Sequence, residues 1–235
     1  MSESEAPFVV VFDLDGTLAA TAGDILAAIN QLMVAEGLPT FAPEKAFELV
    51  SLGNGARALI DAAFRNNGRF LNDSELDTQM ANYLANYLAA VCVHSDLYPD
   101  CQTMLELLQE RGYRLAVCTN KPQAHSEQLL ARLGIREHFA AVAGVDTYTF
   151  HKPDPRHLLQ VISDAGGTAR RAVMVGDTKV DIRTARAADV PIIGLGHGYS
   201  DIPIAQLAPD VTLDDFAGLA DAIDSIRDQL LVSHV

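Results

Sequence analysis

Residues 8–18 read Phe-Val-Val-Val-Phe-Asp-Leu-Asp-Gly-Thr-Leu, and five apolar residues there run directly into two nearby aspartates. An uninterrupted run of Val and Phe is typical of a strand buried on both faces in the middle of a parallel sheet. Ligands of such sheets bind beyond the carboxyl ends of the strands, so Asp13 and Asp15 are expected where a substrate binds. Gly16 permits the sharp turn that lets both carboxylates point into a common space. An ordinary polar turn is the alternative reading of this motif alone.

The composition is that of a folded globular protein. The 235 residues are 49% apolar and 20% charged, which suits one large domain or one domain that carries an insertion. The formal net charge of −14 argues against nucleic acid or an anionic membrane surface as a partner. The three cysteines show no Cys-x-x-Cys spacing, and no apolar run approaches the length of a membrane span. We therefore expect a cytoplasmic protein with reduced thiols.

Apolar runs alternate with helical patterns through the second half of the chain. Strands are expected at residues 114–118, 140–144, 171–175 and 191–195, with a weaker one near 210–213. Alternation of this kind predicts an α/β fold in which helices cover both faces of a parallel sheet.

Residues 21–97 interrupt this alternation. They hold no convincing strand, and apolar residues such as Ile25, Ile29 and Leu32 recur at helical spacing. We predict that residues 21–97 form a small helical domain, inserted into a core domain made of residues 1–20 and 98–235. An insertion at the ligand-binding end of the first strand has the position of a lid.

Polar residues also follow three of the later strands. Thr119 and Asn120 precede an expected helix start, where backbone N–H groups favour a phosphate oxygen, although helix capping alone explains them as well. Lys152 is restricted by the proline after it and is a candidate source of positive charge, whereas a solvated loop lysine is the commoner case. Asp177 and Asp181 follow the fourth expected strand, and Asp181 also suits the first turn of a helix.

Four aspartates are therefore expected at one edge of the sheet. Like charges about 4 Å apart repel by roughly 4 kcal/mol at an effective dielectric near 20, so the arrangement needs a cation. Mg²⁺ suits a site that offers a few carboxylates together with water and phosphate oxygens. The proposed ligands are Asp13, Asp15, Asp177 and Asp181.

The order Asp13-Leu-Asp-Gly-Thr, Thr119-Asn120, Lys152-Pro153 and Gly176-Asp177-x-x-x-Asp181 resembles the haloacid dehalogenase superfamily of phosphohydrolases. The resemblance implies a Rossmann-like parallel sheet core with a small inserted α-helical cap. It also implies that Asp13 is the nucleophile that forms an aspartyl-phosphate, and that Asp15 is the general acid and base.

The same resemblance implies roles for the remaining motif residues. Mg²⁺ would be held by the Asp13 carboxylate, the Asp15 backbone carbonyl and Asp177, with Asp181 as a ligand or just behind one. Thr119, Asn120 and Lys152 would bind the phosphate and neutralise its charge.

Within this superfamily, three segments are similar to phosphoglycolate phosphatases: Gly53-Asn-Gly-Ala-Arg57, Cys118-Thr-Asn-Lys-Pro122 and Gly198-Tyr-Ser-Asp. The similarity implies hydrolysis of 2-phosphoglycolate, with Arg57 pairing with the substrate carboxylate. A solvated helix arginine is an equally open reading. Ala19-Ala-Thr21 stands where the family commonly has Val-Asp-Ser, which leaves hinge behaviour and substrate preference open.

Other functions on the same scaffold remain open. These are a sugar-phosphate, nucleotide or pyrophosphate phosphatase, a mutase resembling β-phosphoglucomutase, and a non-catalytic Mg²⁺-binding regulatory protein. Asp15 argues against dehalogenation, because that branch of the family lacks the second aspartate. The expected partner is a small phosphate ester, and the chain is expected to act as a monomer or homodimer.

Overall fold

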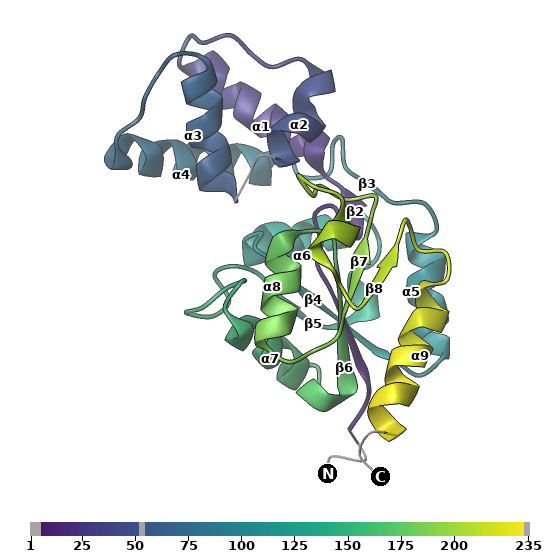
Figure 1. Cartoon of the computed structure of the whole chain (residues 1–235). Coiled ribbons are helices and arrows are strands. Elements are labelled where there is room, and N and C mark those ends of the chain that lie inside the picture. The colour runs from purple at the N-terminus through teal and green to yellow at the C-terminus, as the bar shows by residue number, and fades with distance from the viewer. Residues whose placement is uncertain (1–5, 52–54, 233–235) are drawn as a thin grey trace. The chain divides into compact units, whose positions relative to one another are not determined.

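The computed structural model describes residues 6–51 and 55–232 (Figure 1). The chain divides into two compact units, Met1–Ala20 with Leu97–Val235 and Thr21–Asp96. We call the first the sheet unit and the second the helical unit. The boundary between residues 96 and 97 lies one residue before the boundary expected from the sequence.

The sheet unit contains a six-stranded sheet in the order β5-β4-β1-β6-β7-β8, and all of its strand pairs are parallel. Its central strand β1 (Val9–Phe12) is fully buried, as the apolar run predicts. The parallel α/β fold expected from the sequence is confirmed. The other strands are β4 (Arg114–Cys118), β5 (Phe139–Ala143), β6 (Ala172–Gly176), β7 (Ile192–Leu195) and β8 (Val211–Leu213), each within one residue of its expected bounds.

Helices cover both faces of this sheet. Val9 and Val11 pack in one buried cluster with residues of α7 (Pro155–Asp164) and α8 (Lys179–Ala187). Val10 and Phe12, which alternate with Val9 and Val11 along β1, point to the opposite face of the sheet. On that face α5 (Cys101–Glu110) contacts β4, and α9 (Leu219–Val232) contacts β6 (Figure 1). The remaining helices of this unit are α6 (Gln123–Arg132) and three short 3₁₀ helices, Arg136–His138, Ala169–Arg171 and Ile204–Leu207.

The helical unit is built from α1 (Ala22–Ala35), α2 (Ala46–Ser51), α3 (Ala56–Asn66), α4 (Asp73–Ala89) and a 3₁₀ turn at Pro43–Lys45. Ile29 and Leu32 of α1 are buried, as their helical spacing predicts. At the start of α4, the Asn72 side chain accepts from the Glu75 N–H, and the Glu75 carboxylate accepts from the Asn72 N–H. This reciprocal cap satisfies two N–H groups that the helix itself leaves unpaired.

Two short strands were not expected from the sequence. β2 (Ala19–Ala20) pairs with β3 (Asp96–Leu97) where the chain passes between the two units. Two residues leave no periodicity in a sequence, so pattern reading misses such strands.

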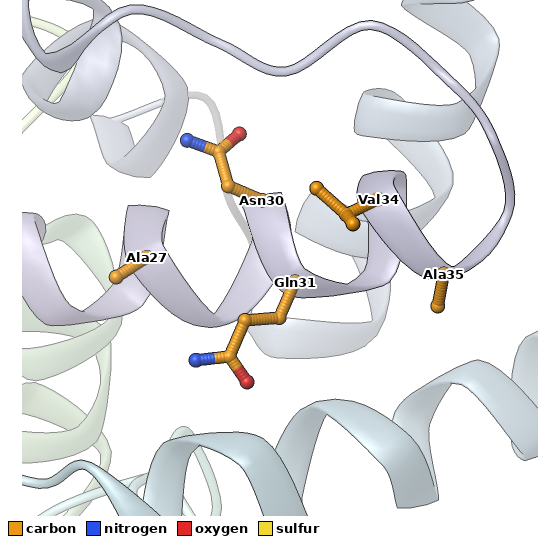
Figure 2. A pocket seen from close by; sticks show the side chains of 5 residues that line it. All are labelled: Ala27, Asn30, Gln31, Val34 and Ala35. Atoms are coloured by element: carbon orange, nitrogen blue, oxygen red, sulfur yellow. The ribbon is translucent and has the colours of Figure 1, made fainter.

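The helical unit also carries a shallow depression on α1, with a volume of about 490 Å³. Figure 2 shows its lining of Ala27, Asn30, Gln31, Val34 and Ala35, none of which is charged or nucleophilic. The depression therefore offers no groups for phosphate chemistry. Throughout residues 6–51 and 55–232, every helix is too short or too polar to cross a membrane.

Candidate active site

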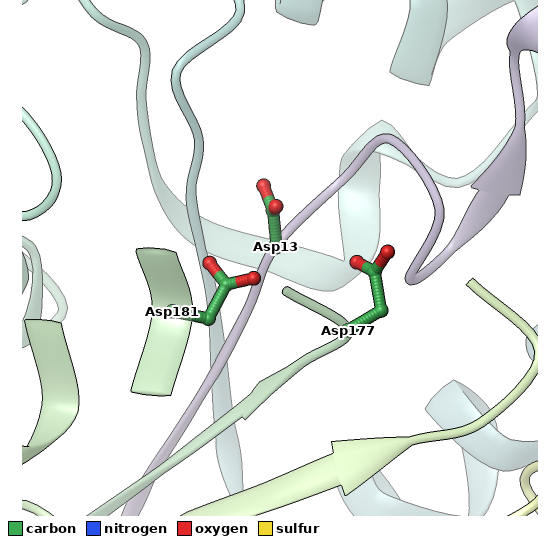
Figure 3. A group of neighbouring side chains, drawn as sticks. All are labelled: Asp13, Asp177 and Asp181. Carbon is green, nitrogen blue, oxygen red and sulfur yellow. The ribbon is translucent and has the colours of Figure 1, made fainter. Parts of the chain in front are cut away.

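Three buried carboxylates meet at the carboxyl ends of β1 and β6. Asp13 directly follows β1, Asp177 directly follows β6, and Asp181 lies in the first turn of α8. Figure 3 shows their carboxylates gathered around a common point, and one oxygen from each lies within 4.8 Å of the others. We call these three residues the acidic cluster.

The ammonium of Lys152 lies against two members of the acidic cluster. Its Nζ is 3.0 Å from Asp13 Oδ1 and 2.6 Å from Asp181 Oδ1, and its side chain is almost fully buried. The loop that carries it is held on two sides. The Lys152 N–H donates to Nδ1 of His157 (3.2 Å), and its carbonyl accepts from Nδ2 of Asn120 (3.0 Å).

Asp177 is fixed by donors from two other loops. Thr17 Oγ1 donates to Asp177 Oδ1 (2.6 Å), and the Tyr199 N–H donates to Oδ2 (2.7 Å). A Cβ on Gly16 or Gly198 would lie 2.4 or 2.2 Å from that Oδ2, too close for any side chain. The two glycines therefore leave the space that Asp177 fills.

The charges within the site are unbalanced. Burial raises the pKa of Asp13 from its ordinary value of 3.8 to about 6, because Lys152 only partly offsets the burial and Asp181 adds repulsion. Burial, Asp181 and Asp13 together hold the pKa of Asp177 well above its ordinary value. Burial lowers the pKa of Lys152, but Asp13 and Asp181 outweigh it and raise that pKa overall. Three carboxylates thus face one ammonium in a buried space, and a hard divalent cation fits this oxygen donor set.

We expect the excess charge to appear as a pH dependence of stability in the protein freed of divalent cations. In the folded state Asp13 has a pKa of about 6 against 3.8 in the unfolded chain, so folded protein binds this proton more tightly. The stability that the Asp13 proton contributes is then fully present below about pH 4. This contribution, about 3 kcal/mol, is lost as the pH rises through about 6. Urea unfolding in EDTA, compared with Asp13→Asn, measures this contribution.

The Asp13→Asn protein is the control, because its amide does not titrate. As the pH rises, the free energy of unfolding of the wild type should fall relative to that of Asp13→Asn. Added Mg²⁺ should remove this difference, because it favours the ionised carboxylate of the wild type. Parallel pH profiles of the two proteins in EDTA would contradict the charge imbalance.

Thr119 and Asn120 lie just beyond β4, as the sequence predicts. Thr119 is buried, its N–H donates to the Ala143 carbonyl (3.0 Å), and its Oγ1 accepts from the Lys121 N–H (3.2 Å). Asn120 contacts the Lys152 carbonyl and so ties the two loops together. Contact with a phosphate stays a prediction for both residues.

Asp15 lies outside the acidic cluster. Its carboxylate contacts Lys121, whose Nζ is 2.9 Å from Oδ1 and 3.1 Å from Oδ2. No role for Lys121 follows from the sequence pattern. Lys121 precedes a proline as Lys152 does, but nothing nearby in the sequence points to a partner 106 residues away.

Arg57 lies in α3 of the helical unit. It forms ion pairs with Asp77 and Asp73, the second at 3.5 Å, and its side chain is 44% exposed. Gly53 and Asn54 of the same sequence motif lie outside the described residues. Recognition of a substrate carboxylate by Arg57 remains a prediction.

Comparison with known proteins gives consistent similarities. A family model described as haloacid dehalogenase-like hydrolase matches residues 10–195. A phosphoglycolate phosphatase of Agrobacterium fabrum is 41% identical over 215 residues, which cover 92% of this chain and 91% of that protein. One of Mesorhizobium japonicum is 40% identical over 211 residues, or 90% of this chain and 92% of that protein.

A solved structure shows the same fold. The crystal structure of a predicted phosphoglycolate phosphatase from Haemophilus somnus has a TM-score of 0.82 and 32% identity. The match covers 92% of this chain and 97% of that one. The acidic cluster and Lys152 all lie inside the segment matched by the family model.

Proposed function

The chain belongs to the haloacid dehalogenase-like hydrolase family, and from this premise we propose that it is a Mg²⁺-dependent phosphatase acting on a small phosphate monoester. The observation that carries the proposal is the acidic cluster with Lys152 in contact at the carboxyl ends of parallel strands. Buried carboxylates and an ammonium arranged in this way suit phosphoryl transfer, which depends on positioning and charge neutralisation.

Asp13 is proposed as the nucleophile. The Leu14 N–H (2.7 Å) and Lys152 Nζ (3.0 Å) both contact its Oδ1, so Oδ2 is the oxygen that these two donors leave for attack on phosphorus. The attack forms a bond from Asp13 to phosphorus and breaks the bond from phosphorus to the ester oxygen. The covalent aspartyl-phosphate then divides one difficult displacement into two easier ones.

Asp15 is proposed as the general acid and base. It gives a proton to the departing ester oxygen and then takes a proton from the water that attacks the aspartyl-phosphate. That second attack releases inorganic phosphate and restores the Asp13 carboxylate. Its position outside the acidic cluster, with a side chain that is 23% exposed, supports a role in proton transfer.

Asp13, Asp177 and Asp181 are the side chains that would hold Mg²⁺, with the Asp15 backbone carbonyl as the further ligand that the family resemblance implies. When bound, Mg²⁺ supplies positive charge that offsets the carboxylates and the phosphate. Lys152 orients the same anionic groups, and Thr17 together with the Tyr199 N–H keeps Asp177 in place.

We propose 2-phosphoglycolate as the substrate, because relatives that match about nine tenths of the chain carry the name phosphoglycolate phosphatase. The test is phosphate release from 2-phosphoglycolate measured beside sugar phosphates, nucleotides and pyrophosphate. A kcat/KM for 2-phosphoglycolate at least about tenfold above every other compound is expected, which corresponds to 1.4 kcal/mol of preference. Faster hydrolysis of another compound would replace the substrate and keep the reaction type.

Arg57→Ala is expected to weaken phosphoglycolate hydrolysis by roughly tenfold in kcat/KM, because it removes a charge-assisted pair with the substrate carboxylate. Hydrolysis of ethyl phosphate, which has no carboxylate, should change little. Arg65→Ala is the matched control, since Arg65 forms an exposed ion pair with Asp61 on the same helix. Equal losses on both esters would remove Arg57 from substrate recognition.

A further inference from the structure

A second buried lysine, Lys121, lies against the carboxylate of Asp15. Its Nζ is within hydrogen-bond distance of both carboxylate oxygens, at 2.9 and 3.1 Å, and only 4% of its side chain is exposed. Burial of an ammonium is costly unless a partner compensates it. The ion pair with Asp15 therefore compensates for the desolvation of the Lys121 ammonium.

The backbone around Lys121 is held on both sides. Its N–H donates to Thr119 Oγ1 (3.2 Å), and its carbonyl accepts from the Val145 N–H (3.0 Å). A Cβ on Gly144 would lie 2.6 Å from that carbonyl oxygen, so the two loops approach too closely for any other residue there. The backbone of Lys121 is therefore held in one position, and its side chain extends from there to Asp15.

The two buried lysines contact different aspartates. Lys152 contacts Asp13 and Asp181 of the acidic cluster, whereas Lys121 contacts Asp15. A carboxylate whose two oxygens both contact a buried ammonium is restrained in its rotation about its side-chain bonds. Asp15 is thereby kept at a defined place, which proton transfer in a transition state requires.

From this geometry we infer that Lys121 is a positioning residue for Asp15, the general acid and base of the proposed reaction. The inference rests on the proposed phosphatase function and deepens it. Lys121 acts through Asp15 and makes no contact of its own with the substrate. Its loss should therefore damage only those steps in which Asp15 moves a proton.

Lys121→Met keeps the length of the side chain and removes its charge. With 2-phosphoglycolate, whose alkoxide leaving group needs a proton, kcat should fall by about 10²-fold and KM should change by less than about threefold. With p-nitrophenyl phosphate, whose leaving group needs none, the first release of nitrophenol should keep its rate. Later turnovers should slow, because the attacking water still needs Asp15 as a base. A burst of nitrophenol that is larger than in the wild type is the expected signature.

A double-mutant cycle separates positioning from substrate contact. In the wild-type background Lys121→Met slows the steady-state turnover of p-nitrophenyl phosphate, whereas in an Asp15→Asn background it should change that turnover by less than about twofold, since the group that it positions is gone. An equal loss in both backgrounds, or a raised KM with unchanged kcat, would overturn the inference and assign Lys121 to the substrate.

Lys45→Met is the matched control, because Lys45 forms an exposed ion pair with Glu48 in the helical unit. It should leave all of these rates unchanged. Lys121→Gln provides a second variant if Lys121→Met does not fold, as judged by its thermal unfolding midpoint, and should show the same burst. A wild type inactive on every ester would defeat the phosphatase proposal itself. An active wild type with an unaltered Lys121→Met would defeat the positioning role alone.

Discussion

Asp13→Asn is expected to lower the rate of phosphate release by roughly 10⁵-fold or more, because an amide does not replace a carboxylate nucleophile. The amide oxygen still accepts from the Leu14 N–H and from Lys152, so the site should keep its geometry. The measurement is phosphate release from 2-phosphoglycolate at saturating Mg²⁺.

Asp228→Asn is the matched control for that loss. Asp228 lies on α9, where it pairs with Arg227 and is 65% exposed, so its amide should leave the rate unchanged. An Asp13→Asn protein that retained more than about a hundredth of wild-type activity would contradict Asp13 as nucleophile, because loss of such a group costs far more.

Lys152→Met is expected to reduce both turnover and stability. Lys152 is proposed to neutralise charge on the reacting phosphate, and loss of such a group costs about 10²–10³-fold in kcat. Removal of one partner of a buried ion pair costs about 3–5 kcal/mol of folding stability, since Asp13 and Asp181 then lie buried without their ammonium. Urea unfolding in EDTA and phosphate release in Mg²⁺ measure the two effects separately.

Lys179→Met tests whether these effects belong to burial. Lys179 pairs with Asp201 at 3.0 Å, but both side chains are about two fifths exposed, and such pairs contribute at most about 1 kcal/mol. Equal losses of stability in Lys152→Met and Lys179→Met would contradict the larger contribution expected from the buried ion pairs of Lys152.

The fold could be predicted from the sequence because its signals are local. The apolar run of β1 (Val9–Phe12) and the alternation that follows it predicted a parallel sheet, and the structure confirms both. Strand ends carry chemistry in such sheets, so the polar residues after each apolar run also pointed to one edge. Asp13, Asp177 and Lys152 meet there in the structure.

Contacts between residues far apart in the sequence could not be predicted from sequence patterns. The pairing of Lys121 with Asp15 joins residues 106 positions apart, and the bond from Thr17 to Asp177 joins residues 160 apart. Neither pair leaves a periodic trace in the chain. The pairing of Arg57 with Asp77 has the same character, because an arginine on a helix surface accepts many partners.

The separation of Asp15 from the acidic cluster refines the picture of four crowded aspartates. Repulsion among like charges was the reason to expect a cation, and it applies most strongly to the three carboxylates that are buried together. Lys121 offsets the charge of the fourth. Three aspartates are thus grouped together, as the proposed metal site requires, and the fourth pairs with Lys121 instead.

Trapping of the covalent intermediate tests the central claim most directly. Wild-type protein mixed with substrate and Mg²⁺, quenched in acid and reduced with borohydride, should yield homoserine at position 13 when its peptides are mapped by mass spectrometry. Phosphate release at the wild-type rate with no modification of Asp13, or with modification of another aspartate, would contradict the account.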